Sequence, residues 1–159
     1  MVTVREAKPD EWELLRDVRL AALREAPEAF ASTYAREAPY PEQRWRGWFS
    51  DQSVMFFPYV AGGAEPAGLA GVLVKNGAAQ LVSMWVRPDA RGHGVAGALV
   101  SAAAGWAKAR GHEAMYLWVA ESNDSARRLY ERCGFTATGQ SQPLPSNPEL
   151  PEIRMLRQL

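Results

Sequence analysis

The first third of the chain begins with a β-type segment and continues into a helical pattern. Val2–Glu6 is short and rich in β-branched residues, so it predicts a first strand. Pro9 and Asp10 then favour a helix start, because proline is tolerated in the first turn and an acidic side chain opposes the helix dipole. Pro27 limits this helix, and Pro41–Phe49 predicts a second short one after a polar, aromatic connection. One apolar stripe at helical spacing predicts the buried face of the first helix: Leu14, Leu15, Val18, Ala21 and Ala22.

Apolar segments of strand length fill the middle of the chain. Ser53–Ala61 and Ala67–Lys75 are rich in β-forming residues and are separated by a glycine- and proline-containing turn. Asn76-Gly77 then predicts a hairpin turn into Ala79–Val86. The pattern therefore predicts three consecutive antiparallel strands.

A helix and another apolar strand follow this meander. The helix begins near Gly94, and its stripe repeats at spacings of 4, 3 and 4 before Gly111 can end it: Val95, Leu99, Ala102 and Trp106. Ala114–Ala120 is the next apolar run. Because it follows a crossover helix, we expect it to lie parallel to Leu81–Val86.

The C-terminal part predicts one more helix and two strands. Asn123–Cys133 has a capping asparagine at its start, an acidic first turn and a glycine just beyond its end. Phe135–Gln142 and Ile153–Leu159 are expected as terminal strands, joined by a proline-rich loop over Pro143–Pro151. The element order is therefore βααβββαβαββ, which places the chain in the α/β class. One face of the last helix combines Ala126, Leu129, Tyr130 and Cys133.

Composition and charge argue against several classes of function. At 159 residues, the chain fits one domain over residues 1–159. Lysine plus arginine and aspartate plus glutamate balance at 18 each, which argues against nucleic acid or an anionic membrane as the main partner. The single cysteine, Cys133, cannot form an internal disulfide, and there is neither a signal-peptide pattern nor a membrane-length apolar run. We therefore expect a cytoplasmic protein. We also expect no metal site, because the chain has two histidines, one cysteine and no carboxylates clustered at the spacing of metal ligands.

The glycine-rich turn over residues 91–97 is the strongest chemical feature. A helix starts at these glycines, so its first N–H groups are free and its positive dipole end is exposed. Such a start binds anions, above all phosphate. A Cβ at the glycines would block the close approach of a phosphate oxygen to the backbone.

The same glycines also match a dinucleotide-binding motif. Gly92, Gly94 and Gly97 have the G-x-G-x-x-G spacing, and Glu121 lies 24 residues past Gly97, where a ribose-binding acid is expected. Against a Rossmann domain, Arg87–Arg91 separates the glycines from the preceding strand, and the segments before it favour an antiparallel meander. Only one βαβ unit is predicted, so this interpretation is the less favoured one.

Two motifs resemble a known enzyme family. Arg91-x-x-Gly94-x-Ala96 is similar to the acetyl-CoA pyrophosphate loop of the GNAT N-acetyltransferases. About thirty residues further, Asn123-x-x-Ala126-x-x-Leu129-Tyr130, followed by Gly134-Phe135, resembles the second half of that family's cofactor site. The resemblance implies the GNAT fold over essentially the whole chain, with a mixed seven-stranded sheet flanked by four helices.

The resemblance also implies which residues hold the ligands. Arg19–Leu23 and Glu25–Tyr34 look like one branch of the superfamily, in which the first two helices wall the acceptor side. Acetyl-CoA would be held by the end of the strand before the loop, by the loop and by the last helix: Met84, Trp85, Val86, Arg91, Gly92, His93, Gly94, Val95, Ala96, Gly97, Asn123 and Arg128. The acceptor side would be lined by Glu28, Phe30, Tyr34 and Trp118.

The sequence offers several candidates for the groups that transfer protons. The family commonly places a tyrosine at the position of Tyr130 with its hydroxyl near the departing sulfur, which implies a general acid, although the helical spacing equally fits core packing. Some members carry a glutamate on the strand before the glycine loop, but Leu81–Val86 has no carboxylate. Glu121 is the nearest candidate for the general base in sequence, and Glu28 and Glu37 are alternatives.

The sequence therefore predicts an N-acetyltransferase that moves an acetyl group from acetyl-CoA to a primary amine. A small or amino-acid-like acceptor fits the neutral charge and the mildly acidic segment over residues 28–37, and direct transfer in a ternary complex needs no acyl-enzyme. The alternative is a non-catalytic acyl-CoA sensor, which the missing strand glutamate favours and Tyr130 opposes. An exposed edge of the terminal strands could support a homodimer.

Overall fold

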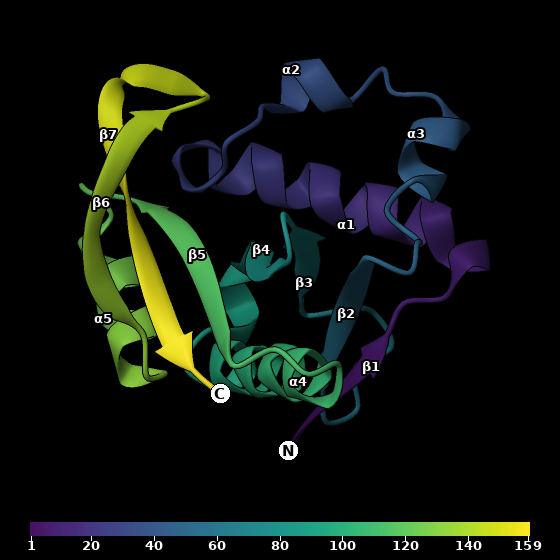
Figure 1. Cartoon of the computed structure of the whole chain (residues 1–159). Helices are drawn as coiled ribbons and strands as arrows, with labels where there is room; N and C mark the ends of the chain where they lie inside the picture. The colour runs from purple at the N-terminus through teal and green to yellow at the C-terminus, as the bar shows by residue number, and fades with distance from the viewer.

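The computed structural model describes all residues, 1–159, and contains one seven-stranded mixed sheet (Figure 1). The strand order across the sheet is β1-β2-β3-β4-β5-β7-β6. The strands are β1 (Val2–Glu6), β2 (Ser53–Val60), β3 (Gly68–Lys75), β4 (Ala78–Val86), β5 (Ala114–Ala120), β6 (Thr136–Leu144) and β7 (Asn147–Gln158). The helices are α1 (Trp12–Glu25), α2 (Tyr34–Glu37), α3 (Glu42–Arg46), α4 (Val95–Ala109) and α5 (Asp124–Arg132). The predicted fold class is confirmed, with the single-turn helix α2 added to the four expected helices.

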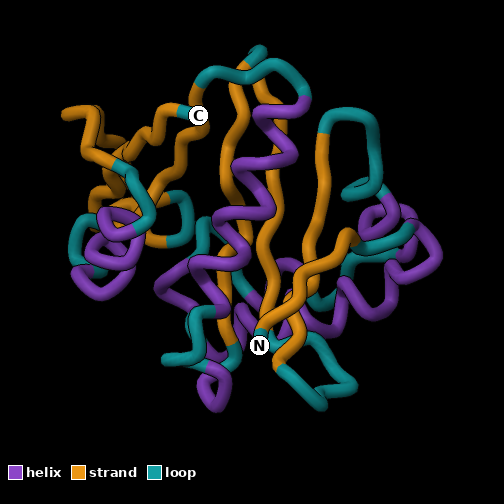
Figure 2. The backbone as a smooth tube through the Cα atoms, turned by 90° about the horizontal axis from the view of Figure 1, so that it is seen from below, coloured by secondary structure: helices purple, strands orange, loops and turns teal.

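Two helical layers cover the sheet from opposite sides. In Figure 1, α1 lies with α2 and α3 above the sheet, whereas α4 lies below it, and Figure 2 shows α4 running along the strands. Alternate residues of β2 enter the two layers: Val54 and Phe56 pack with α4, while Met55 and Phe57 pack with α1. This is why β2 is an unbroken apolar run, since a strand buried on both faces has no polar side to show.

The predicted meander and the predicted crossover are both present. β2 pairs with β3 and β3 pairs with β4, all antiparallel, and β4 pairs with β5 in parallel after the α4 crossover. The parallel ladder covers only two residue pairs, Ala79 with Met115 and Gln80 with Tyr116. Beyond these pairs β4 and β5 separate, and the functional site lies in that region.

Residues 143–151 correct one prediction, because they do not form a loop. β6 and β7 continue through them, with Pro143 opposite Pro151 and a tight turn at residues 145–146. Pro143 is tolerated because β6 is an edge strand, where a missing N–H donor costs little and the fixed φ angle suits an extended chain. Pro151 lies on β7 just beyond its ladder with β5, which ends at Glu152. Ser146 at the tip donates a hydrogen bond to the carbonyl oxygen of Phe30 at 2.7 Å, which ties this hairpin to the segment after α1.

The buried face of α1 also differs from the predicted stripe. Ala21 is exposed, whereas Arg19 is buried together with the apolar residues Leu15, Val18, Ala22 and Leu23. Burial of an arginine requires a counter-charge, and α2 provides it in Glu37. Thr33 caps the start of α2, and its side chain accepts a hydrogen bond from the Arg36 N–H group at 3.1 Å.

Candidate functional site

The gap between β4 and β5 is widened by a β-bulge in β4. Opposite Ala70 of β3, strand β4 carries two residues, Ser83 and Met84, and Ser83 has a φ angle of 60°. Non-glycine residues rarely adopt this conformation, and bulges bend the strand that carries them. Past the bulge, the backbone groups of β4 that face β5 have no strand partner.

The glycine-rich turn leads into the start of α4 beside this gap. Gly92 and Gly94 have φ angles of 85° and 80°, which glycine adopts without strain. The first hydrogen bond of α4 runs from the Ala98 N–H group to the Gly94 carbonyl at 3.1 Å. The N–H groups of residues 95–97 therefore precede the helical ladder and are free to bind an anion. A Cβ added at Gly92, Gly94 or Gly97 would meet no protein atom within 4 Å, so the space over the turn is open.

We call the cavity over this turn the loop-side cleft, and its volume is about 780 Å³. It brings together ten of the twelve predicted cofactor residues: Met84, Trp85, Val86, Arg91, Gly92, Gly94, Val95, Ala96, Gly97 and Asn123. His93 and Arg128 are exposed and do not line the cleft. Glu28, predicted for the acceptor side, lines this cleft instead.

Arg91 is held at the mouth of the loop-side cleft by two acceptors. Its Nε donates to the Val86 carbonyl at 3.0 Å, and its Nη2 is paired with the carboxylate of Glu25. The same carboxylate accepts a hydrogen bond from the Trp85 indole at 2.9 Å. The Trp85 hydrogen bond, with help from Arg91, lowers the pKa of Glu25 against a smaller opposing effect of burial. Arg91 thus lines the same cleft as the free amides of the turn.

Asn123 caps α5 at the other side of the cleft. Its side-chain oxygen accepts a hydrogen bond from the Ala126 N–H group at 3.2 Å. The structural role proposed by the sequence pattern, that of a helix cap, is therefore present. The cap orients α5 so that Ser125, Ala126 and Leu129 also line the loop-side cleft.

A second cavity, the acceptor-side cavity, lies on the other side of the gap and has a volume of about 580 Å³. It contains the predicted residues Phe30 and Trp118, whereas Tyr34 lies outside it and accepts a hydrogen bond from Arg24. Glu121 is exposed and lines neither cavity. The two cavities share four lining residues: Ala29, Met84, Trp118 and Tyr130.

Tyr130 occupies the junction of the two cavities. Its ring packs edge-on against Phe135, with ring centroids 5.8 Å apart, and its hydroxyl has no hydrogen-bond partner within the chain. Burial raises the pKa of Tyr130 well above its ordinary value, and the neighbouring Cys133 adds to this. The phenol therefore stays protonated at neutral pH and can act as a hydrogen-bond or proton donor.

A buried ion pair supports the bulge from the N-terminal layer. Arg19 donates to both carboxylate oxygens of Glu37, at 3.0 and 2.9 Å, and to the hydroxyl of Ser83 at 2.9 Å. The guanidinium also lies over the Phe30 ring, 4.9 Å from its centroid. Burial alone would raise the pKa of Glu37, but the hydrogen bonds and charge of Arg19 outweigh it and hold the pKa below its usual value. Sequence patterns missed this pair because its partners lie on different helices.

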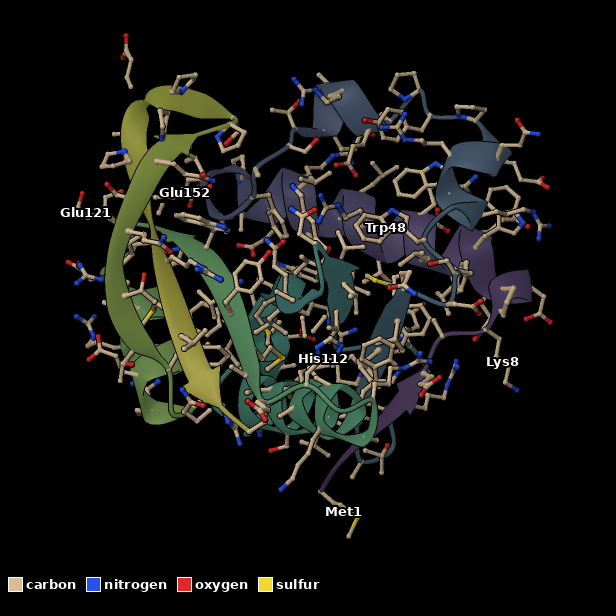
Figure 3. The ribbon with its side chains drawn as sticks, viewed as in Figure 1. Met1, Lys8, Trp48, His112, Glu121 and Glu152 are labelled. Atoms are coloured by element: carbon tan, nitrogen blue, oxygen red, sulfur yellow. The ribbon has the colours of Figure 1, made fainter.

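Glu152 is the second residue that sequence reasoning missed. It lies on β7 opposite Ala120, is only 4% exposed and lines the acceptor-side cavity. Its carboxylate accepts a hydrogen bond from the Gln142 side chain at 2.6 Å. Figure 3 shows Glu121 at the outer edge of the molecule and Glu152 inward of it, toward α1. The sequence did not indicate that Glu152 lies on a strand at the cavity, because the proline-rich stretch before it predicted a loop.

Comparisons with known proteins agree with this architecture. The model of the Acetyltransferase (GNAT) family matches residues 19–135, which is more than half of the chain. An uncharacterized N-acetyltransferase of Methanocaldococcus jannaschii is 30% identical over 109 residues; the alignment covers 60% of this chain and 47% of that protein. The chain thus matches about half the length of this curated relative.

Two solved structures show the same fold at low sequence identity. The ribosomal-protein-S18-alanine N-acetyltransferase of Escherichia coli superposes with a TM-score of 0.71 at 21% identity, covering 99% of this chain and 94% of that one. The spermidine N-acetyltransferase of Vibrio cholerae, solved with CoA and spermine, gives a TM-score of 0.77 at 19% identity, covering 99% and 95%.

The chain belongs to the GNAT acetyltransferase family. The predicted family is therefore confirmed, and with it the predicted acetyltransferase class. The strands before the glycine turn form an antiparallel meander, whereas a Rossmann domain needs parallel strands there. The match of the glycines to the dinucleotide-binding motif is therefore coincidental. None of the helices combines the length and apolarity needed to cross a membrane.

The Arg19–Glu37 pair generates a stability prediction. Glu37→Gln leaves a buried guanidinium without its counter-charge, so we expect the free energy of unfolding to fall by about 3–5 kcal/mol. Urea unfolding at pH 7 measures the change. Glu42→Gln is the matched control: it removes an exposed pair with Arg46 (2.7 Å), which we expect to cost less than about 0.5 kcal/mol. Because the pKa of Glu37 is lowered, its contribution is present above the usual carboxyl pKa and is lost as pH falls through the lowered one. Equal losses in the two variants would contradict the prediction.

Proposed function

We propose that the protein transfers the acetyl group of acetyl-CoA to the primary amine of a small acceptor, by direct attack in a ternary complex. The observation that carries the proposal is the meeting of two cavities at Tyr130, one lined by free helix amides and the other by mixed polar and aromatic side chains. Such a pair of sites holds a phosphate-bearing donor and an acceptor on either side of one proton-donating group.

The loop-side cleft fits coenzyme A at its phosphate end. The free N–H groups of residues 95–97 and the positive end of α4 suit the diphosphate, and Arg91 adds a charge-assisted donor beside them. At Met84, Trp85 and Val86, the main-chain groups of β4 that face β5 have no strand partner there, and these groups would bind the amide groups of the pantetheine arm. Asn123 lies across the cleft from β4 and would contact the same arm.

The chain's own groups would act mainly by positioning. Acetyl-CoA supplies an activated acetyl thioester. The walls of the two cavities align the amine with it and exclude water, which is worth several orders of magnitude in rate. Tyr130 is proposed to donate a proton to the departing sulfur, because its raised pKa keeps the phenol protonated until a thiolate forms.

The charges of the acceptor-side cavity favour an amino-acid-like acceptor. Two basic side chains without an acidic partner, Lys75 and Arg154, line it against one acidic side chain, Glu152, because the charge of the third, Arg19, is neutralised by Glu37. An acceptor with a carboxylate near its amine would satisfy both signs, whereas a polyamine would meet excess positive charge. The structural relatives act on a polyamine and on a ribosomal protein, so the fold itself does not choose between acceptors.

An amine panel tests the proposed function. We expect acetyl-CoA to release free thiol with at least one L-amino acid or amino-acid amide, at a kcat/KM about tenfold above that with spermidine. Release of CoA is followed with a thiol reagent, and a short peptide with a free N-terminal amine covers the protein-acceptor class. Tight acetyl-CoA binding with no release above hydrolysis for any amine would contradict the proposal and favour an acyl-CoA sensor.

The role of Tyr130 is tested by Tyr130→Phe. The substitution keeps the packing against Phe135 and removes only the hydroxyl, so we expect kcat to fall about 100-fold while the KM for acetyl-CoA stays within twofold. Single-turnover measurements keep chemistry rate-limiting. Tyr59→Phe is the control, because Tyr59 lies on β2 outside both cavities. Full turnover in Tyr130→Phe would exclude a general-acid role.

A further inference from the structure

The acceptor-side cavity contains one acidic side chain, and that side chain is buried. Glu152 is 4% exposed, and its carboxylate has a hydrogen bond from Gln142 but no basic group within ion-pairing distance. A buried carboxylate without a cationic partner is costly, and such groups concentrate at functional sites. Its place in the fold therefore requires an explanation beyond packing.

The other carboxylates near the site are unsuited to accept a proton from the acceptor. Glu37 is engaged by Arg19 through both oxygens, and Glu28 lines the opposite cleft. Glu121, the candidate nearest in sequence, is exposed and lines neither cavity. The segment of β4 before the glycine turn carries no carboxylate at all.

The backbone brings Glu152 close to the reacting groups. Its Cα pairs with that of Ala120 at the end of β5, and Ala120, Trp118 and Tyr130 all line the same cavity as Glu152. Figure 3 shows Glu152 beside the C-terminal hairpin and Trp48 over α1, and both residues line the acceptor-side cavity. An amine bound in this cavity would therefore lie next to both Glu152 and Tyr130.

We propose that Glu152 is the general base of the transfer, receiving the acceptor ammonium and taking its proton directly or through one water. The inference rests on the proposed function. The carboxylate removes one proton from the ammonium, and the freed lone pair attacks the thioester carbonyl. As the C–N bond forms and the C–S bond breaks, Tyr130 gives its proton to the sulfur, and the second nitrogen proton returns to the phenolate. Glu152 releases its proton to solvent, which leaves amide, free thiol and one proton.

The environment of Glu152 suits this task. Burial raises the pKa of its carboxyl above the ordinary value, with the Gln142 hydrogen bond opposing the rise. A carboxylate with a raised pKa is a better proton acceptor than an ordinary one. The hydrogen bond from Gln142 also fixes the orientation of the carboxylate within the cavity.

Glu152→Gln tests the proposal, because glutamine preserves shape and can still accept the Gln142 hydrogen bond. With the best amine of the panel, we expect kcat/KM at pH 7 to fall about 100-fold. The kcat/KM of wild type should level off above the acid limb of its pH profile. In Glu152→Gln, kcat/KM should instead rise tenfold per pH unit up to the pKa of the amine, because without the base only the free amine reacts. Affinity for CoA, measured by calorimetry, should stay within twofold. Glu149→Gln, an exposed glutamate of the same strand, is the matched control and should behave as wild type.

A second variant covers the case in which Glu152→Gln does not fold. Gln142→Leu removes the donor that stabilises the carboxylate, so the acid limb of the wild-type profile should move to higher pH. An unchanged limb in Gln142→Leu, or an increased KM in Glu152→Gln with an unchanged pH profile, would overturn the role of base. If the wild-type enzyme releases no thiol with any amine, the proposed function fails and this inference with it; turnover with unaltered profiles overturns this inference alone.

Discussion

The separation of β4 from β5 is the constraint on which the rest of the structure depends. Parallel pairing stops after Gln80, and the bulge at Ser83 turns β4 away from its neighbour. The left-handed backbone of Ser83 is held by a hydrogen bond from Arg19, and Arg19 is tolerated in the interior because Glu37 neutralises it. An ion pair between two N-terminal helices thus supports the opening in the centre of the sheet.

The opening joins two environments with different chemistry. On one side, the free amides of α4 and the anchored Arg91 suit an anionic group. On the other side, the C-terminal hairpin and α1 enclose a polar cavity, and the hydrogen bond from Ser146 to Phe30 fixes the hairpin over it. Tyr130 stands where the two meet, so the geometry gives one side chain access to both ligands.

Local patterns in the sequence predicted most of the fold and most of the residues that line the loop-side cleft. Strand alternation, the Asn76-Gly77 turn and the glycines of the loop act over a few residues, so their structural effects can be recognised without tertiary information. Arg19 could not be recognised in this way, because its burial depends on Glu37, which is 18 positions away and on another helix. Glu152 was hidden by prolines that indicate a loop, although one of them lies on the edge strand β6, one in the turn after it and the others in the part of β7 beyond its ladder with β5. The position of Glu121 shows the converse: proximity in sequence to the site does not orient a side chain into it.

The central claim, that the amides after Gly94 bind the diphosphate of coenzyme A, is tested most directly by calorimetric titration of CoA. Wild type, Gly94→Ala and Gly62→Ala form a matched set, because both glycines have φ near +80° and neither would bring a Cβ into contact with the protein. An alanine costs about 1–2 kcal/mol in this conformation, so both variants carry the same backbone penalty. The account predicts that CoA binds to wild type and to Gly62→Ala with equal affinity, and to Gly94→Ala at least tenfold more weakly. Equal affinity for all three proteins, or no binding to folded wild type, would contradict it.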